Sequence, residues 1–295
     1  MLFIFVERVL VVISFTKTDI IKYSIRMLAS RLSRGIGRRM LSSVQQKKSH
    51  VVLSDIPNLV LSADKIDTAK PPGYVRETLR ELGPGCAVCF DVDSTVLTDE
   101  GIDMLAEQAG CGLEVKELTS SAMDGLTLFE DSLQARLNVI RPSLAMLEKF
   151  NKRPTTFTPG LQGLVEQLQR RGVDVFLVSG GFRQMIDPVA LKLGLDPKHH
   201  VVANTLLFDA NGDFEGFDST EPTSRSGGKA KALQQLRERN NFSKIVMVGD
   251  GVTDLEARPP ADIMIGFGGV VVRPKVRDGA DWFVTDFATF MKELD

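Results

Sequence analysis

The feature that most constrains the fold of this 295-residue chain is an apolar segment that ends abruptly in two carboxylates. Residues 86–90 read Cys-Ala-Val-Cys-Phe, and Asp91 and Asp93 follow with a single valine between them. A continuous apolar run of this length is typical of a buried central strand in a parallel sheet. We therefore expect a strand over 86–91 that delivers acidic side chains to one edge of a sheet, with Asp91 as the candidate centre of the chemistry.

Helix and strand patterns alternate around this segment. Beyond the first strand, the expected elements are strands over 173–178, 244–248, 261–265 and 281–284, helices over 74–82, 161–171, 182–193, 230–239 and 286–294, and a hairpin of 201–208 with 214–217. Such alternation predicts an α/β fold with a doubly wound, mostly parallel sheet covered on both faces. Sheets of this kind bind ligands at the carboxyl ends of their strands, where the polar motifs of this chain fall.

One long segment interrupts the alternation. Residues 100–153 are helical in pattern throughout, beginning with apolar positions at helical spacing up to Gly110, which is a typical helix stop. The economical interpretation is a helical cap domain over 100–153, inserted into an α/β core made of residues 71–99 and 154–295.

Positive charge is concentrated at the N-terminus. Residues 1–50 carry a net charge of +8, and because the whole chain carries −2, the remainder carries −10. An acidic body gives no reason to expect nucleic acid as a partner. Residues 20–50 hold eight basic and no acidic residues together with several serines, which is the composition of a mitochondrial or plastid transit peptide.

We therefore expect residues 1–70 to be a basic extension, a transit peptide followed by a linker, with a translation start at Met27 as a variant of that hypothesis. A plain basic tail on a cytoplasmic protein is the alternative. No uninterrupted apolar segment reaches the 18 or so residues that a membrane span needs.

Three cysteines provide no disulfide framework and suit a reducing compartment. Cys86 and Cys89 form a C-x-x-C pattern, but residues three apart on a strand face opposite sides of the sheet. We expect buried apolar thiols there rather than a shared metal or a redox pair.

The polar motifs at the strand ends have complementary chemistry. Asp91 and Asp250 on neighbouring strands make a minimal Mg²⁺ site, because this hard cation takes a few carboxylate oxygens from protein and fills the rest with water and phosphate. Ser179 with the Gly180 and Gly181 amides is expected to form an anion-binding nest at a helix N-terminus, and Lys229 supplies positive charge. Each motif alone is common in turns, and the glycines also suit tight backbone turns, so only the ordered set is informative.

Because Asp91 and Asp93 lie only two residues apart, we expect them to have different chemical roles. An ionised Asp91 can attack phosphorus to form an aspartyl phosphate. Asp93 can protonate the departing alkoxide and later accept a proton from water, provided that its pKa lies near working pH.

As an ordered set, these motifs resemble the haloacid dehalogenase superfamily: D-V-D-S-T at 91–95, S-G-G-F at 179–182, G-G-K at 227–229 and G-D-G-V-T-D at 249–254. The resemblance is closer still to the branch of that superfamily that acts on O-phospho-L-serine. The residues that carry this closer match are D-E-G-I-D at 99–103, A-M-D-G at 122–125, Phe129, Arg136 and G-F-G-G at 266–269. It spans about residues 73–292 and leaves the first 70 residues unexplained.

The resemblance implies roles for individual residues. Asp91 would be the nucleophile and a Mg²⁺ ligand, Asp93 the acid and base and a ligand through its backbone carbonyl, and Asp250 the third protein ligand. The remaining expected site residues are Ser179, Gly180, Gly181, Lys229 and Thr253 for phosphate, Glu100 and Arg136 for the ammonium and carboxylate of the substrate, Met123, Gly125 and Phe129 around the pocket, and Asp254 beside Lys229 or a nearby water. Spacing alone instead favours a surface ion pair of Arg136 with Asp131 or Glu130, and a core position for Phe129.

The implied function is that of a Mg²⁺-dependent phosphomonoesterase that hydrolyses O-phospho-L-serine to L-serine and phosphate, in serine biosynthesis. One alternative is a phosphatase for another small phosphomonoester, such as phosphohomoserine. A non-catalytic nucleotide-binding module is a second alternative, and the lack of G-x-x-x-x-G-K-[ST] and of G-x-G-x-x-G after the first strand speaks against it. The expected partner is a small-molecule substrate, and a homodimer stays open.

Overall fold

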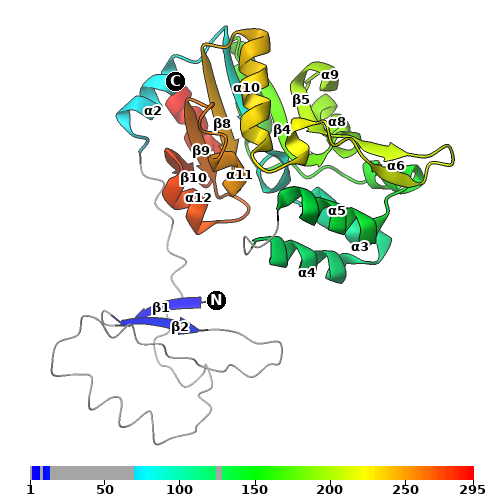
Figure 1. Cartoon of the computed structure of the whole chain (residues 1–295). Helices are drawn as coiled ribbons and strands as arrows, with labels where there is room; N and C mark the ends of the chain where they lie inside the picture. The colour runs from blue at the N-terminus through cyan, green and yellow to red at the C-terminus, as the bar shows by residue number, and fades with distance from the viewer. Residues whose placement is uncertain (1, 7–8, 14–69, 124–127) are drawn as a thin grey trace, which may run out of the picture. The chain divides into compact units, whose positions relative to one another are not determined.

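The computed structural model describes residues 2–6, 9–13, 70–123 and 128–295 (Figure 1). The chain divides into two units, Met1–Ala63 and Asp64–Asp295. In the first unit, strands β1 (Leu2–Val6) and β2 (Val9–Ile13) form an antiparallel hairpin. The transit peptide expected over 20–50, and the linker up to residue 69, lie outside the described residues.

A six-stranded parallel sheet forms the centre of the second unit. In spatial order its strands are β10 (Trp282–Val284), β9 (Ile263–Phe267), β8 (Lys244–Gly249), β3 (Cys86–Phe90), β4 (Asp174–Phe182) and β5 (Val201–Asn204). Strand β3 pairs in parallel with β8 on one side and β4 on the other, so Asp91 leaves the sheet at its middle. The predicted α/β fold with a mostly parallel sheet is confirmed.

Helices cover both faces of this sheet. One face packs against α2 (Gly73–Arg80), α7 (Leu161–Arg170), α8 (Arg183–Lys192) and α13 (Phe287–Leu294), and the other against α10 (Gly228–Asn240) and α12 (Pro274–Gly279). Because side chains alternate along a strand, Cys86 points into the first hydrophobic cluster and Cys89 into the second. The expectation that these two thiols lie on opposite faces is confirmed.

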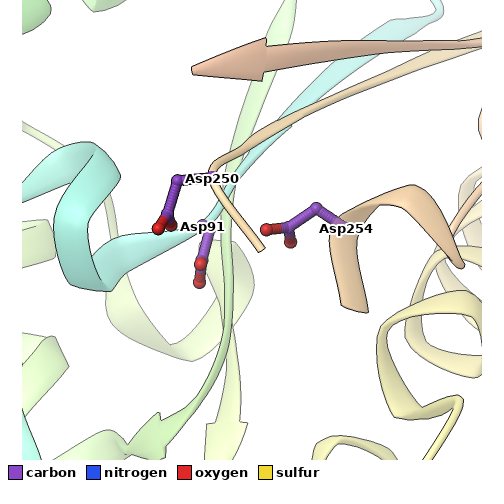
Figure 2. Close-up of side chains that lie close together, drawn as sticks. All are labelled: Asp91, Asp250 and Asp254. Carbon is purple, nitrogen blue, oxygen red and sulfur yellow. The ribbon is translucent and has the colours of Figure 1, made fainter. Parts of the chain in front are cut away.

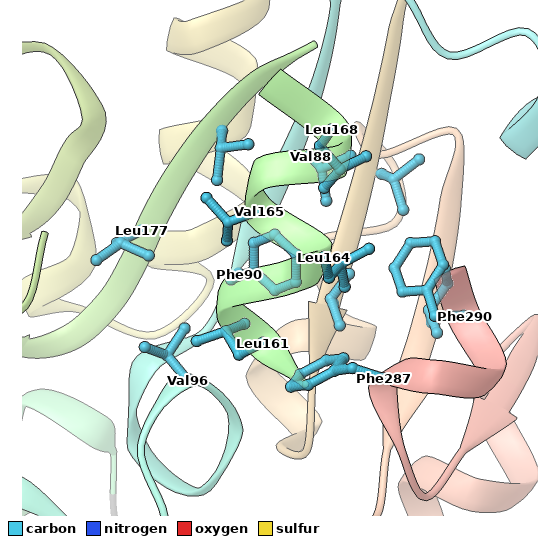
Figure 3. Packing of buried hydrophobic residues seen from close by; sticks show 14 of the residues in the cluster. Val88, Phe90, Val96, Leu161, Leu164, Val165, Leu168, Leu177, Phe287 and Phe290 are labelled. Carbon is cyan, nitrogen blue, oxygen red and sulfur yellow. The ribbon is translucent and has the colours of Figure 1, made fainter. Parts of the chain in front are cut away.

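The first hydrophobic cluster, the larger of the two, packs tightly against the strand ends. Figure 3 shows α7 laying Leu161, Leu164 and Leu168 against it, all fully buried. Phe287 stacks on Phe267 with ring centroids 4.3 Å apart and meets Phe90 edge-on at 6.2 Å. Each such side chain contributes roughly 1.5–3 kcal/mol by leaving water. The apolar contacts of Phe90 therefore fix the end of β3, next to Asp91.

The segment between β3 and α7 is helical, as the sequence predicts. It holds α3 (Gly101–Ala109), α4 (Gly112–Met123), α5 (Phe129–Ile140) and α6 (Leu144–Asn151), and α3, α4 and α5 lie side by side (Figure 1). Gly110 ends α3 in the left-handed conformation with φ of 79°, which a side chain would disfavour. These helices share a third hydrophobic cluster, separate from the two that line the sheet, with Phe182, Met185, Leu206 and Phe214.

The expected hairpin of 201–208 with 214–217 is only half right. Residues 201–204 form β5 and pair in parallel with β4, while only β6 (Leu206–Phe208) pairs with β7 (Phe214–Phe217). The apolar pattern runs on without a break from Val201 to Phe208, so it does not reveal where the chain leaves the sheet. Short helices α9 (Pro197–His200), η3 (Pro222–Ser224) and α11 (Val252–Leu255) complete the connections. Among the described residues, no helix is both long and apolar enough to span a membrane.

Candidate active site

Three aspartates meet at the carboxyl edge of the sheet. Asp91 follows β3 and its backbone N–H donates to Val248 O of β8 at 2.9 Å, so the residues after both strands are brought together. Asp250 follows β8, and Asp254 reaches back from α11. Carboxylate oxygens of the three lie within 4.8 Å of one another, and Figure 2 shows the three side chains gathered at this edge. All three are buried, with Asp254 fully so.

Lys229 joins two of these carboxylates. It lies in the first turn of α10, and its Nζ is 2.7 Å from Asp91 Oδ1 and 2.6 Å from Asp254 Oδ1. Burial alone would lower the pKa of Lys229, but the contacts with Asp254 and Asp91 outweigh burial and raise it, so the ammonium stays charged. Lys229 therefore fixes Asp91 at the sheet edge with a buried positive charge.

Gly249 makes room for Asp254. A Cβ on Gly249 would lie 2.2 Å from Asp254 Cγ, so only glycine fits between β8 and this side chain. The other Asp254 oxygen, Oδ2, accepts a hydrogen bond from the Gly251 N–H at 2.9 Å. Both Asp254 oxygens therefore have partners from the protein, which suits a group that orients Lys229.

Asp93 has different surroundings from Asp91. Its Oδ1 accepts a hydrogen bond from the Gly101 N–H at the start of α3, at 2.7 Å. Burial, together with the negative charges of Glu100 and Asp91, raises the pKa of Asp93 to about 8. A carboxyl group with that pKa carries a proton at neutral pH, as a general acid must. Asp91, in contrast, is ion-paired to Lys229.

The donor set at this edge fits a divalent cation. Burial and the charge of Asp91 raise the pKa of Asp250, and burial raises the pKa of Asp254 to about 7. Crowded, buried carboxylates of this kind are stabilised by positive charge, and oxygen donors are those that Mg²⁺ prefers. Asp91 and Asp250 would hold the ion. The third carboxylate within 4.8 Å is Asp254, but its two oxygens already accept hydrogen bonds from Lys229 and Gly251. The side chain of Asp93 is not part of this group, and the resemblance implies that Asp93 binds the metal through its backbone carbonyl.

The expected nest at 179–181 is wrong in its local structure. Strand β4 continues through Ser179, Gly180 and Gly181 to Phe182, and α8 begins only at Arg183. The pairing of β4 with β5 shifts register between Val178 and Phe182, because the glycines let the strand bulge there. The motif still borders the site: the Gly181 N–H donates to the buried Ser179 Oγ at 2.9 Å, and a Cβ on Gly181 would lie 3.6 Å from Asp93 Oδ2.

The residues expected to read the substrate lie on the helical segment. Glu100 Oε1 accepts a hydrogen bond from Ser94 Oγ at 2.7 Å, and burial raises the pKa of Glu100. Arg136 is half-buried in α5. Burial lowers the pKa of its guanidinium, whereas Asp103, Glu100 and Asp93 raise it, so Arg136 faces the acidic site.

The surface pairing weighed for Arg136 is not among the ion pairs of the described residues. Arg136 Nε donates to Ser132 O at 3.2 Å, while Glu130 Oε2 accepts from Ser226 Oγ at 3.0 Å. Phe129 is half-buried and packs with the third hydrophobic cluster, and its ring covers Gly180, where a Cβ would lie 2.8 Å from Cζ. Phe129 therefore has both a core contact and a contact with the 179–181 motif, so the two positions weighed for it do not exclude each other.

The other expected site residues are less informative. Met123 ends α4 and its side chain is not described, and Gly125 lies outside the described residues. Thr253 lies in α11, half-exposed, next to Asp254.

Two residues at the site escaped the sequence analysis. Arg273 Nε donates to Asp250 Oδ2 at 2.8 Å, and the fully buried Asn204 donates through Nδ2 to Gly180 O at 2.8 Å. Asn204 ends strand β5, so a polar residue at a strand's carboxyl end was an available signal. Arg273 precedes Pro274 in a loop and carries no comparable signal.

Comparison with known proteins finds hydrolases and phosphatases, in agreement with the chemistry that this site suggests. A family model of haloacid dehalogenase-like hydrolases matches residues 87–262. The chloroplastic phosphoserine phosphatase of Arabidopsis thaliana is 52% identical over 212 residues, which cover 71% of this chain and 72% of that protein. The phosphoserine phosphatase of Homo sapiens is 50% identical over 210 residues, which cover 71% of this chain and 93% of that protein.

Solved structures give the same result. A phospho-aspartyl intermediate analogue of phosphoserine phosphatase matches with a TM-score of 0.62 at 30% identity, covering 72% of this chain and 100% of its own. A substrate-bound phosphoserine phosphatase complex matches with a TM-score of 0.62 at 29% identity, covering 71% and 98%. The chain therefore belongs to the haloacid dehalogenase-like hydrolases and, among them, to the phosphoserine phosphatase family.

Proposed function

We propose that this protein hydrolyses O-phospho-L-serine to L-serine and phosphate through an aspartyl phosphate on Asp91, with Mg²⁺ as cofactor. The observation that carries the proposal is the pairing of two unlike carboxyl groups: Asp91, held by Lys229 at 2.7 Å, and Asp93, whose pKa is raised to about 8. The substrate is supported by the activity named for the relatives and by the opposite charges of Glu100 and Arg136 beside this pair.

In the first step, an Asp91 oxygen attacks phosphorus and the bond from phosphorus to the seryl oxygen breaks. Asp93 gives its proton to the departing seryl oxygen, so serine leaves as the neutral alcohol. Lys229 offsets negative charge on the phosphoryl oxygens, a role for which its buried ammonium is already oriented.

In the second step, Asp93 takes a proton from water as the water oxygen attacks phosphorus. The bond from phosphorus to Asp91 breaks, which releases phosphate and restores both carboxyl groups. Bound Mg²⁺, held by Asp91, Asp250 and the Asp93 carbonyl, would neutralise charge on the phosphoryl group. General acid–base catalysis by Asp93 is expected to raise the rate roughly 10²- to 10⁴-fold.

The division of the chain follows from these roles. Residues 71–99 and 154–295 are the core that carries the chemistry, 100–153 is the cap that reads the amino acid, and 1–70 is an extension.

We propose that this extension directs import into a mitochondrion or plastid, with the cytoplasm as the alternative, and that the enzyme serves serine biosynthesis. One relative is chloroplastic. A fusion of residues 1–60 to a reporter, offered to isolated organelles, tests import, and a reporter that stays outside contradicts it. Assembly as a homodimer stays a prediction.

Phosphate release from O-phospho-L-serine by the full chain, with and without Mg²⁺, tests the function. We expect Mg²⁺-dependent turnover that Asp91→Asn abolishes. Comparable rates on phosphohomoserine, phosphothreonine, glycerol phosphate or sugar phosphates would contradict the substrate, and full activity of Asp91→Asn would contradict the mechanism.

A further inference from the structure

The loop after β9 brings an arginine to the site. Gly268 and Gly269 have no room for side chains, since a Cβ would lie 2.3 Å from Phe283 Cζ in one case and 2.3 Å from Phe267 Cζ in the other. The Gly268 N–H also donates to Val284 O at 2.8 Å, which anchors the loop to β10. The G-F-G-G motif thus sets the path of the chain that leads to Arg273.

Proline holds Arg273 at the end of this path. The residue before a proline is restricted to extended backbone, and Arg273 has φ of −102° and ψ of 116°. Pro274 then begins α12, whose Val276 is fully buried against the sheet. Arg273 therefore leaves a fixed backbone, and 27% of its side chain is exposed.

Its guanidinium joins two carboxylates from different parts of the fold. Arg273 Nε lies 2.8 Å from Asp250 Oδ2 at the sheet edge, and Nη2 lies 3.5 Å from Glu100 Oε1 at the start of the helical segment. Burial raises the pKa of Glu100, and so does the charge of Asp250, whereas Arg273 lowers it. The arginine is thus the positive charge that keeps these two acids close together.

The planar guanidinium of arginine suits this connection better than an ammonium does. The two contacts use separate N–H groups of one planar guanidinium, whereas an ammonium is a single point charge. Glu100 also accepts from Ser94 Oγ at 2.7 Å, and Asp250 Oδ1 accepts from Thr95 Oγ1 at 3.3 Å. Glu100 is therefore held from two directions, by Ser94 and by Arg273.

We propose that Arg273 is a positioning residue for amino-acid recognition, which acts by holding the Glu100 carboxylate in place for the ammonium group of the substrate. The inference rests on the proposed function. It assigns the specificity for an amino group partly to a loop that follows β9, remote in sequence from the residue that reads that group.

The test measures binding instead of turnover. Calorimetric titration in the full chain carrying Asp91→Asn, with Mg²⁺, compares O-phospho-L-serine with 3-phosphooxypropanoate, which is phosphoserine without its amino group. Arg273→Met is expected to weaken binding of phosphoserine about tenfold, the effect of one charge-assisted contact, and binding of the desamino ligand less than about twofold. Arg277→Met, which removes an exposed arginine of α12 paired with Asp278, is the matched control and is expected to change neither.

A second arm tests whether Arg273 acts through Glu100. When Glu100→Gln is already present, Arg273→Met should weaken binding of O-phospho-L-serine by less than about a further twofold, because the group that Arg273 positions no longer carries charge. The affinity of Arg273→Lys for O-phospho-L-serine should lie between those of wild type and Arg273→Met. Arg273→Lys replaces the methionine variant if that variant does not fold.

The outcomes separate the two proposals. Equal losses for both ligands would mean that Arg273 acts on Asp250 and the metal, and would overturn the inference, as would unchanged binding of phosphoserine. If the wild-type chain neither binds nor hydrolyses O-phospho-L-serine, the proposed function fails first and the inference fails with it.

Discussion

The sheet edge and the helical segment hold their charged groups in different ways. Asp254, Asp250, Lys229 and Asp91 at the sheet edge are between 0% and 8% exposed, and each contacts another charged group directly. On the helical side, 41% of the Glu100 side chain is exposed, and Arg136 is half-buried with its Nε bonded to a backbone carbonyl. One region is fixed and the other is partly open to solvent.

In the proposed mechanism, this difference separates the groups that react from the groups that bind the substrate. Buried ion pairs on a rigid sheet hold reacting groups to a narrow geometry, which is what proton and phosphoryl transfer require. Groups that read a substrate must first admit it, and partial exposure leaves them a route for exchange with water. We therefore expect changes at the sheet edge to reduce kcat, and changes on the helical side to raise KM.

The largest effect is expected from Asp93→Asn. The amide keeps the size of the side chain but cannot donate an acidic proton to serine, so kcat should fall by about 10²- to 10⁴-fold with little change in KM. Steady-state kinetics on O-phospho-L-serine measure both values. Asp174→Asn, the same substitution at the exposed start of β4, is the control and should behave as wild type.

The pH profile sharpens this prediction. An acid works in its protonated form, so kcat of the wild type should fall as pH rises through the raised pKa of Asp93, near 8. The residual activity of Asp93→Asn should lack that falling limb. An unchanged limb in the variant would assign the proton to another group.

Lys229→Met comes next. It leaves the carboxylates of Asp91 and Asp254 buried without their shared cation, so kcat should fall by about 10²- to 10³-fold and the free energy of unfolding by about 3 kcal/mol. Urea denaturation and kinetics measure the two effects. Lys231→Met, two residues along the same helix, should change neither, and a similar loss there would show that α10 itself is sensitive.

Arg136→Met should raise KM for O-phospho-L-serine by about tenfold to a hundredfold and leave kcat within about threefold, because a bidentate partner for the substrate carboxylate is lost. Phosphoethanolamine, which lacks that carboxylate, should be affected little. A loss confined to kcat would place Arg136 with the sheet-edge groups and break the division.

The smallest effect is expected from Gly180→Ala. The new methyl group would meet Phe129 Cζ at 2.8 Å and push the start of α5 away from β4, so KM should rise a few-fold. Adding Phe129→Leu should restore part of the loss by removing the far end of the ring. Unchanged KM in Gly180→Ala would mean that this contact does not set the pocket.

Most of the sheet edge was predictable from the sequence, because each group follows a recognisable element. Asp91 and Asp250 come directly after apolar strands, and parallel strands place their carboxyl ends together. The strand conformation at 179–181 was not predictable, since two adjacent glycines are unusual in a strand and favour a turn from local preference alone. Here pairing with β5 and the hydrogen bond from Asn204 to Gly180 O override that preference.

Arg273 shows what local patterns cannot supply. It lies 23 residues after Asp250 along the chain and 173 after Glu100, in a loop without periodicity, and only packing of the glycine motif brings it to both. The pKa of Asp93 likewise depends on burial and on Glu100, which are tertiary facts. The resemblance identified Asp93 and Glu100 but not Arg273, and the contacts among these residues are visible only in the folded structure.

The most direct measurement is mass spectrometry of the full chain, acid-quenched after mixing Asp93→Asn with O-phospho-L-serine and Mg²⁺. With the second proton transfer slowed, a phosphoryl group should accumulate on the peptide that contains Asp91, and should be absent when Asp91→Asn is also present. A quenched enzyme that turns substrate over without any phosphoryl group on that peptide would contradict Asp91 as the nucleophile.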